Sequence, residues 1–265
     1  MKEYLLNQLN NILMLAEDVV EYKNEESVHD FRVALRRFLA IYNILKKQTE
    51  IPLEILSYID TIKEIRGSTN NLRDLDVLKS HIQTLKFTTE FGEKGKDTLL
   101  IVLDQKIKQE HDKVLNILLN AQIKEKIEKL SIFFNSLDIN INQISYLKKF
   151  LKKIRKCHKS DLNDETIHVI RIQFKKIRYL LESLNSHVDK IEMIKSVQDL
   201  LGNYNDYRIG INILRSILEE KITLAKNYLY SIGFAEALFL FKKNELKDKI
   251  ILESKTVLKE IRNIC

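Results

Sequence analysis

The chain carries the stretch Val28–Phe38, VHDFRVALRRF, and repeats its pattern in the stretch Ile167–Ile177, IHVIRIQFKKI. His29 matches His168 at an offset of 139 residues, and the basic positions that follow match at the same offset. This offset is about half of the 265-residue chain, and self-similarity on that scale indicates an internal duplication. The repeat therefore predicts two related halves, each with one histidine followed by a series of cations.

Each repeat has the periodicity of an amphipathic helix. At about 100° per residue, the histidine and the cations of one repeat fall on one side of a helix, and the apolar residues fall on the other side, which suits packing on a core. The two predicted polar stripes hold His29, Arg32 and Arg36 in the first repeat, and His168, Arg171, Lys175 and Arg178 in the second.

The composition predicts an all-α protein. Hydrophobic residues make up 45% of the chain and charged residues 31%, with one proline and six glycines, which favours long helices around a core. We expect two pseudo-symmetric four-helix bundles with additional helices, which together form one domain, 1–265. The short polar segment 136–142 is the predicted seam between the halves 1–135 and 143–265.

The expected helices follow from apolar periodicity and from breaker residues. Ser27 and Thr166 are expected to be the N-caps of the two repeat helices. The predicted helices span 2–23, 27–48, 52–68, 71–89, 94–119, 121–135, 143–160, 166–186, 188–201, 203–230 and 234–263.

A second pair of signatures follows the repeats. Residues 67–78, GSTNNLRDLDVL, correspond to residues 197–206, VQDLLGNYND, so that Asn71 aligns with Asn203 and Asp74 with Asp206. Asparagine followed three residues later by aspartate suits a helix start, where both side chains meet free backbone amides. The alternative is that the aspartates hold basic side chains in place.

Taken together, these motifs resemble the CHAD family, the conserved-histidine α-helical domain. The resemblance covers nearly the whole chain and rests on His-x-x-Arg-x-x-x-basic-basic in each half, then RDLD at 73–76 and LGNYND at 201–206. Two positions depart from the family pattern, since Leu39 replaces a basic residue and Asn70 replaces a glycine. The resemblance implies two helical bundles with a basic surface that binds inorganic polyphosphate, on polyphosphate granules or beside polyphosphate-related enzymes.

The basic residues are suited to such a ligand, because cations along a polyanion displace its condensed counterions. Arginine offers phosphate a planar fork of donors, and lysine offers a compact charge. Five basic residues share one face of a predicted helix, although such a stripe is more often only solvated: Lys148, Lys152, Arg155, Lys156 and Lys159. The predicted polyphosphate-binding residues are His29, Arg32, Arg36, Arg37, Lys47, Lys63, Lys148, Lys152, Arg155, Lys156, Lys159, His168, Arg171, Lys175, Lys176, Arg178 and Lys195.

The sequence contains no motif of a known catalytic or metal site, such as a glycine-rich phosphate loop, His-Glu-x-x-His or paired cysteines at metal-binding spacing. We therefore expect no catalytic residue, no metal and no cofactor. An RNA- or DNA-binding protein that uses the same basic patch is the alternative function, and a phosphoprotein adaptor is a third. The basic stripes contain no aromatic residues on which bases could stack, which favours a plain polyanion.

The chain is also expected to be cytoplasmic. It has two cysteines in no recognisable framework, and it lacks a leader-like segment and any apolar run of the ~20 residues that span a bilayer. The formal net charge is +7, a moderate excess whose distribution matters more than its size.

Overall fold

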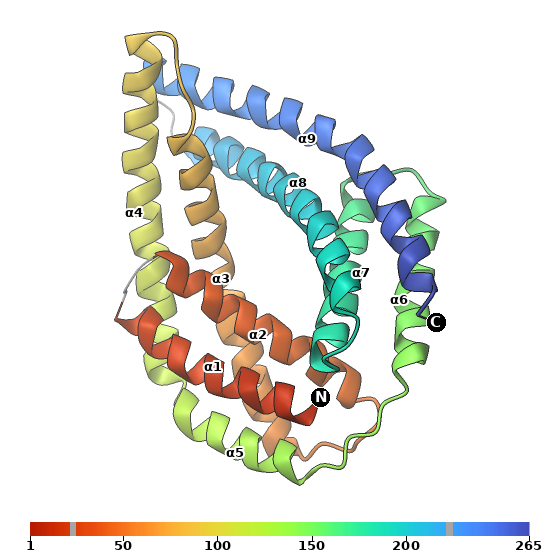
Figure 1. Cartoon of the computed structure of the whole chain (residues 1–265). Coiled ribbons are helices and arrows are strands. Elements are labelled where there is room, and N and C mark those ends of the chain that lie inside the picture. The colour runs from red at the N-terminus through yellow and green to blue at the C-terminus, as the bar shows by residue number, and fades with distance from the viewer. Residues whose placement is uncertain (22–24, 221–224, 265) are drawn as a thin grey trace.

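The structure, a computed structural model, describes residues 1–21, 25–220 and 225–264 (Figure 1). This described part contains α-helices and no strand, which confirms the all-α prediction. The helices are α1 (Lys2–Val20), α2 (Glu25–Leu45), α3 (Leu53–Gln83), α4 (Glu90–Asn120), α5 (Ile123–Ser136), α6 (Gln143–His158), α7 (Asp164–Ser183), α8 (Val188–Glu220) and α9 (Lys226–Arg262).

Four helices form a closed inner ring, in which α2 packs on α3, α3 on α8, α8 on α7, and α7 on α2 (Figure 1). Each inner helix has an outer neighbour: α1 covers α2, α4 covers α3, α9 covers α8, and α6 covers α7. Helix α5 packs on α1 and α3. Both repeat helices, α2 and α7, therefore belong to the inner ring. The internal duplication and the division into halves at 136–142 stay predictions from the sequence.

The apolar faces of the repeat helices are buried as predicted. Phe31 and Phe38 of α2 and Phe174 and Ile177 of α7 are fully buried. Burial of each such side chain stabilises the fold by about 1.5–3 kcal/mol. The opposite, polar stripes are thereby fixed in orientation, because each helix cannot turn without exposing its apolar face.

The breaks predicted inside α3 and α8 are wrong. Helix α3 runs through 69–70 without interruption and α8 runs through 202, so Asn71 and Asn203 lie inside helices and do not cap them. Neither Gly67 nor Gly202 has a positive φ, and a glycine inside a helix costs only about 1 kcal/mol. Buried isoleucines and leucines on both sides of each predicted break offset this cost.

The predicted N-caps are also wrong. Helix α7 begins at Asp164, and Asn163 is its N-cap, with Thr166 as the reciprocal member of a capping box. Ser27 lies inside α2 and is buried. The break predicted between 230 and 234 is absent, because α9 is continuous there. Residues 22–23 and 221–224, which were predicted to be helical, lie outside the described residues.

Helices α4 and α9 meet at backbone contact. The Ser231 hydroxyl donates a hydrogen bond of 2.8 Å to the Gly92 carbonyl oxygen. At Gly95 a Cβ atom would clash with the Asn227 carbonyl oxygen, so only glycine allows this approach. The contact joins the two sequence halves on the outer side of the ring. None of the helices in the described part of the chain is long and apolar enough to cross a membrane.

Candidate functional site

The inner ring gathers cations from all four of its helices. Because α2 packs on α7, the two polar stripes meet, and each stripe affects the ionisation of the other. The signature regions of α3 and α8 add one arginine each. We call this group the central site; its cations, all partly buried, are Arg32, Arg36, Arg73, Arg171, Lys175, Arg178 and Arg208.

Two aspartates from the signature motifs lie among these cations. Burial raises the pKa of Asp74 on α3. The charges of Arg32 and Arg171 lower this pKa, and the charge of Asp206 on α8 raises it. Asp74 therefore interacts electrostatically with cations of α2 and α7, and the alternative interpretation of the Asn-x-x-Asp pattern, that the aspartates hold basic side chains in place, stays a prediction. Their two charges are fewer than the cations around them, so the central site stays positive.

The cations of the central site repel one another. Burial, followed by the positive charges of Arg171 and Arg36, lowers the pKa of Lys175 from 10.5 to about 6. Burial, followed by Arg36, lowers the pKa of Arg32 to about 10. A like charge in a poorly solvated place disfavours the protonated form. A bound anion would relieve this repulsion, so the arrangement suits a negatively charged ligand.

Two of the central cations of α7, Arg171 and Lys175, are left with free donors. The buried Nε atom of Arg171 has no hydrogen-bond partner, and no hydrogen bond or ion pair of Lys175 occurs among the described residues. Buried donors without partners are rare in folded proteins, so the unpaired Arg171 Nε atom costs about 1–3 kcal/mol of stability. A ligand with acceptor oxygens would satisfy them.

The cations of α2 are held by the protein itself. Arg32 Nη1 donates to Thr69 Oγ1 of α3 at 2.8 Å, and Arg36 Nε donates to the Arg32 carbonyl oxygen at 3.3 Å. Helix α2 therefore supplies prearranged charges that have fewer free donors than those of α7.

Glu182 joins the two repeat helices at the edge of the central site. Its carboxylate lies 3.3 Å from Arg37 Nε of α2 and 3.2 Å from Arg178 Nε of α7. Tyr4 of α1 also donates a hydrogen bond to it, at 3.1 Å. Because one carboxylate holds two arginines, this ion pair fixes the α2–α7 contact and uses part of the binding capacity of both arginines.

The two histidines lie at the ends of the polar stripes. Burial, followed by Arg73, lowers the pKa of His29, and burial, followed by Arg171, lowers the pKa of His168. His29 is partly buried and His168 is exposed. Both rings are therefore expected to be mostly neutral at pH 7 and close enough to the cations to contact the same ligand.

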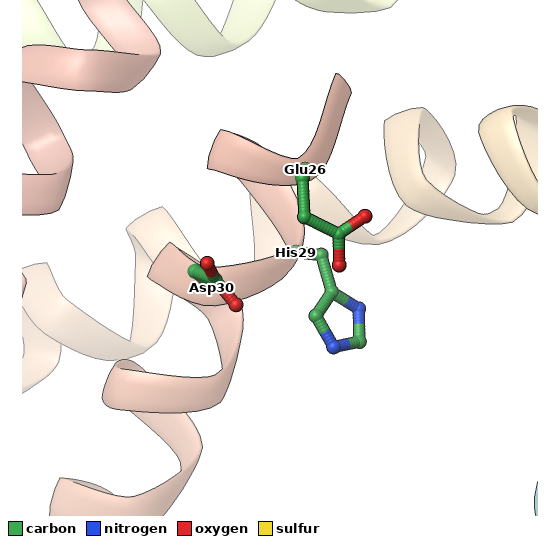
Figure 2. A group of neighbouring side chains, drawn as sticks. All are labelled: Glu26, His29 and Asp30. Carbon is green, nitrogen blue, oxygen red and sulfur yellow. The ribbon is translucent and has the colours of Figure 1, made fainter. Parts of the chain in front are cut away.

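One group of side chains near this site could hold a metal ion. The ligand atoms of Glu26, His29 and Asp30, on the first turns of α2, lie within 4.8 Å of one another (Figure 2). Both carboxylates are exposed, and exposed acids are often close together without a metal. No second feature points to a cation there, and the expected absence of a metal stays a prediction.

Comparison with known proteins identifies the fold. The sequence model of the CHAD domain matches residues 3–215. The chain belongs to the CHAD family. The crystal structure of the CHAD domain from the plant Ricinus communis superposes with a TM-score of 0.79 at 18% identity, covering 96% of this chain and 90% of that chain. PptA from Streptomyces chartreusis superposes with a TM-score of 0.65 at 12% identity, covering 99% and 97%. A search of curated proteins finds no match.

In this CHAD domain, several predicted site residues lie away from the central site. Lys63 is paired with Asp60 at 2.7 Å and Lys195 with Glu192 at 2.5 Å, each on its own helix. An acid three residues before a lysine lies beside it on the same helical face, which accounts for both pairs. The predicted binding residues between positions 148 and 159 lie exposed on α6 and in the turn after it: Lys148, Lys152, Arg155, Lys156 and Lys159.

The structure adds residues that the sequence-based list omits. Arg73 lies within the first signature motif and Arg208 lies two residues after the second, and their position beside Asp74 and Asp206 in the sequence was the available signal. Lys149 and Lys153 of α6 lie near Lys47 and Lys176. They flank the apolar stripe of α6 on the side opposite to Lys148 and Lys152, and the helical pattern alone does not tell which flank faces α7.

A pocket of about 360 Å³ borders the central site between α3, α4 and α8. It shares Asp74 with the central site, but its other charges are balanced, as in the ion pair of 2.6 Å between Lys106 and Glu220. This balance makes the pocket a poorer place for an anion than the central site.

Proposed function

We propose that this CHAD domain binds inorganic polyphosphate at the central site without catalysing a reaction. The observation that carries the proposal is the gathering of partly buried, mutually repelling cations from four helices, in which Arg171 and Lys175 have no hydrogen-bond or ion-pair partner among the residues that the structure describes. Only a ligand with several negative charges can compensate so many cations at once. The membership in the CHAD family supports the same proposal through the resemblance described above.

The chemistry of the side chains agrees with phosphate as the repeating unit. Arginine binds phosphate oxygens through parallel N–H donors, and charge-assisted hydrogen bonds of this kind are stronger than neutral ones. The two unpaired donors, Arg171 Nε and the Lys175 ammonium, would each gain an acceptor. The hydrogen bond to Thr69 keeps Arg32 in place before the ligand arrives, which lowers the cost of ordering it on binding.

Nucleic acid is the competing ligand, and the aromatic residues argue against it. Tyr179 lies beside the arginines of the central site, and the Arg178 guanidinium covers its ring at 5.1 Å. Tyr179 is only 3% exposed, so no base could stack on it. Proteins that bind single-stranded nucleic acid offer accessible aromatic faces, and this tyrosine is not one.

The test is a competition titration of labelled polyphosphate against RNA of matched total charge. We expect polyphosphate to be retained preferentially, with a logarithm of affinity that falls linearly with the logarithm of salt concentration. The expected slope is about 0.7 per neutralised phosphate, the value for single strands. Preferential retention of RNA would overturn the proposal, and an affinity independent of salt would indicate a small ligand held in a pocket.

We further propose that the protein acts as a cytoplasmic binding module, on polyphosphate granules or beside polyphosphate-related enzymes. The proposal that the protein does not hydrolyse polyphosphate is tested by incubating the protein with polyphosphate and a divalent metal ion and measuring the released phosphate. We expect no release above background. Release that depends on protein concentration would contradict it.

A further inference from the structure

A row of apolar side chains lies exposed on the outer face of α9. Tyr230, Phe234 and Phe241 are 46%, 39% and 61% exposed, and the exposed Ala237 lies between them. At about 100° per residue, these positions fall within about 60° around the helix axis. We call them the α9 seam: Tyr230, Phe234, Ala237 and Phe241. The seam lies where α9 packs beside α4, on the side of the ring opposite to the contact between α2 and α7 (Figure 1).

Aromatic rings from outside α9 extend the seam and hold it in place. Phe87, in the connection between α3 and α4, packs on Phe234 and Tyr230 with ring centroids 4.8 and 6.0 Å apart. Phe91 of α4 is 50% exposed, and its ring lies 5.8 Å from that of Tyr230. The Phe87 amide donates to Glu93 Oε1 at 2.9 Å. The surface is therefore ordered before a partner arrives, which lowers the cost of binding.

The exposed rings are large enough for the centre of a protein–protein interface. At about 150–250 Å² for a whole aromatic side chain, the exposed parts of four rings present about 300–500 Å²: those of Phe91, Tyr230, Phe234 and Phe241. Each partner of a standard interface buries about 800 Å² in total. The rings thus match the apolar core of such an interface, and the polar side chains around them match its rim.

The spacing of the seam indicates that the partner is a second copy of this chain. The intervals between its residues are 4, 3 and 4, the alternation by which two helices pack along each other. This order reads the same in both directions, so two antiparallel copies of α9 match position by position about a two-fold axis. Tyr230 of each copy lies opposite Phe241 of the other, and Phe234 lies opposite the small Ala237. The space that a Cβ atom would occupy at Gly233 is also open, which leaves room for the other helix.

Charges at the two ends of the seam agree with the same pairing. Lys226 lies four residues before the seam and Asp248 seven residues after it. In the antiparallel pair, Lys226 of one copy and Asp248 of the other are about 4.5 Å apart along the axis, at 1.5 Å per residue. Both side chains are exposed, and neither forms an ion pair among the described residues. The nearby Arg215 and Glu236 compensate each other at 2.6 Å, so the seam is not repelled by a second copy of itself.

We propose that the α9 seam is the dimer interface of this protein, in which α9 packs antiparallel against α9 of a second copy. The interface joins the outer sides of two rings and lies away from both central sites. Dimerisation therefore needs no ligand, and this inference is independent of the proposed function.

The first experiment measures the mass of the protein by sedimentation velocity without polyphosphate, at concentrations from about 1 to 100 µM, a range suited to weak dimers. It compares Phe241→Ala with Leu252→Ala. Leu252 is 70% exposed on the same helix, but it lies beyond the stretch that the second α9 covers, so it is the matched control. Circular dichroism and thermal denaturation check that both variants are folded.

We expect the unmodified chain to form a reversible dimer with a micromolar Kd. Phe241→Ala should raise this Kd about tenfold or more, because truncation of a central aromatic residue weakens an interface strongly. Leu252→Ala should change the Kd less than about threefold. A monomer throughout the concentration range, or equal effects of the two variants, would overturn the proposal.

A charge exchange tests the antiparallel order. Lys226→Asp and Asp248→Lys alone each place like charges opposite each other twice in the dimer, and each should raise the Kd severalfold at low salt. The double variant exchanges the two charges and should restore the Kd of the unmodified chain. Absence of this rescue would overturn the antiparallel pairing. A monomeric protein whose binding to phosphatidylcholine vesicles is lost in Phe241→Ala would show that the seam contacts a membrane instead of a second copy.

Discussion

The two repeat helices differ in how the protein treats their cations. On α2, Arg32 is hydrogen-bonded to Thr69 and Arg36 to the backbone. On α7, the Arg171 Nε atom has no hydrogen-bond partner in the described part of the chain, and burial and neighbouring arginines lower the pKa of Lys175 to about 6. The first two cations of the motif are therefore hydrogen-bonded within the protein on α2, whereas no hydrogen bond of their counterparts on α7 occurs among the described residues. Unsatisfied cations cost stability and are available to a ligand, so we expect α7 to contribute more to binding.

The largest expected effect separates the two helices directly. Arg171→Ala with Lys175→Ala should weaken polyphosphate binding about 100-fold, because two charge-assisted hydrogen bonds contribute about 1.5 kcal/mol or more each. Arg32→Ala with Arg36→Ala should weaken it only about tenfold. Isothermal titration at one salt concentration measures both. Equal losses of affinity, or a larger loss from the α2 pair, would show that the internal hydrogen bonds do not decide how much each helix contributes to binding.

A smaller effect is expected from Lys175 alone, and it has opposite signs for binding and stability. Lys175→Met should weaken binding about tenfold and raise the Tm by about 2–4 °C, since removal of a poorly solvated charge stabilises the fold by about 1 kcal/mol or more. The unfolded chain binds a proton at Lys175 up to pH 10.5, whereas the folded chain does so only below about pH 6. The free energy gained by the variant should therefore be largest at and below about pH 6, decrease as the pH rises, and disappear above pH 10.5.

The control for this variant is Lys148→Met on the exposed face of α6. A surface substitution of this kind usually changes the free energy of unfolding by less than about 0.5 kcal/mol. A Tm increase in the control as large as that of Lys175→Met would mean that the gain comes from the methionine and not from the loss of a repelled charge.

The pH dependence of binding should follow the same residue. Lys175, with a pKa of about 6, and the neutral histidines at 29 and 168 gain protons when a polyanion raises their pKa values. Affinity should therefore increase severalfold as pH falls from about 8 to 6. The charge of the ligand does not change in that range, since internal phosphates stay singly charged. Lys175→Met should remove most of this dependence, and His29→Gln with His168→Gln a smaller part. An unchanged profile in the histidine variant would make both histidines structural.

The smallest expected effect concerns the acids that both repeat helices share. Asp74→Asn removes a negative charge that affects Arg32 of α2 and Arg171 of α7. Affinity should rise about threefold at low salt, and the gain should shrink at high salt as the charges are screened. Weaker binding by the variant would indicate that holding the arginines in place matters more than the charge that Asp74 subtracts.

The sequence predicted the all-α fold and the polar stripes of α2 and α7, because both follow from local periodicity. It did not predict that α3 and α8 run through their glycines and asparagines. Those residues weaken a helix locally, but packing on both sides of Gly67 and Gly202 outweighs the cost. The choice of Lys149 over Lys148 as a neighbour of Lys176 depends on how α6 lies against α7, which no local pattern contains.

The meeting of α4 and α9 has a consequence for the folding kinetics of the chain. The hydrogen bond from Ser231 to the Gly92 carbonyl joins residues 139 positions apart, and contacts at such separations slow folding. Helical pairs such as α1–α2 and α8–α9 can form from local contacts, whereas the ring closes only when distant pairs dock. Since closure also brings the cations of α2 and α7 together, we expect it to be the late, salt-accelerated step of folding.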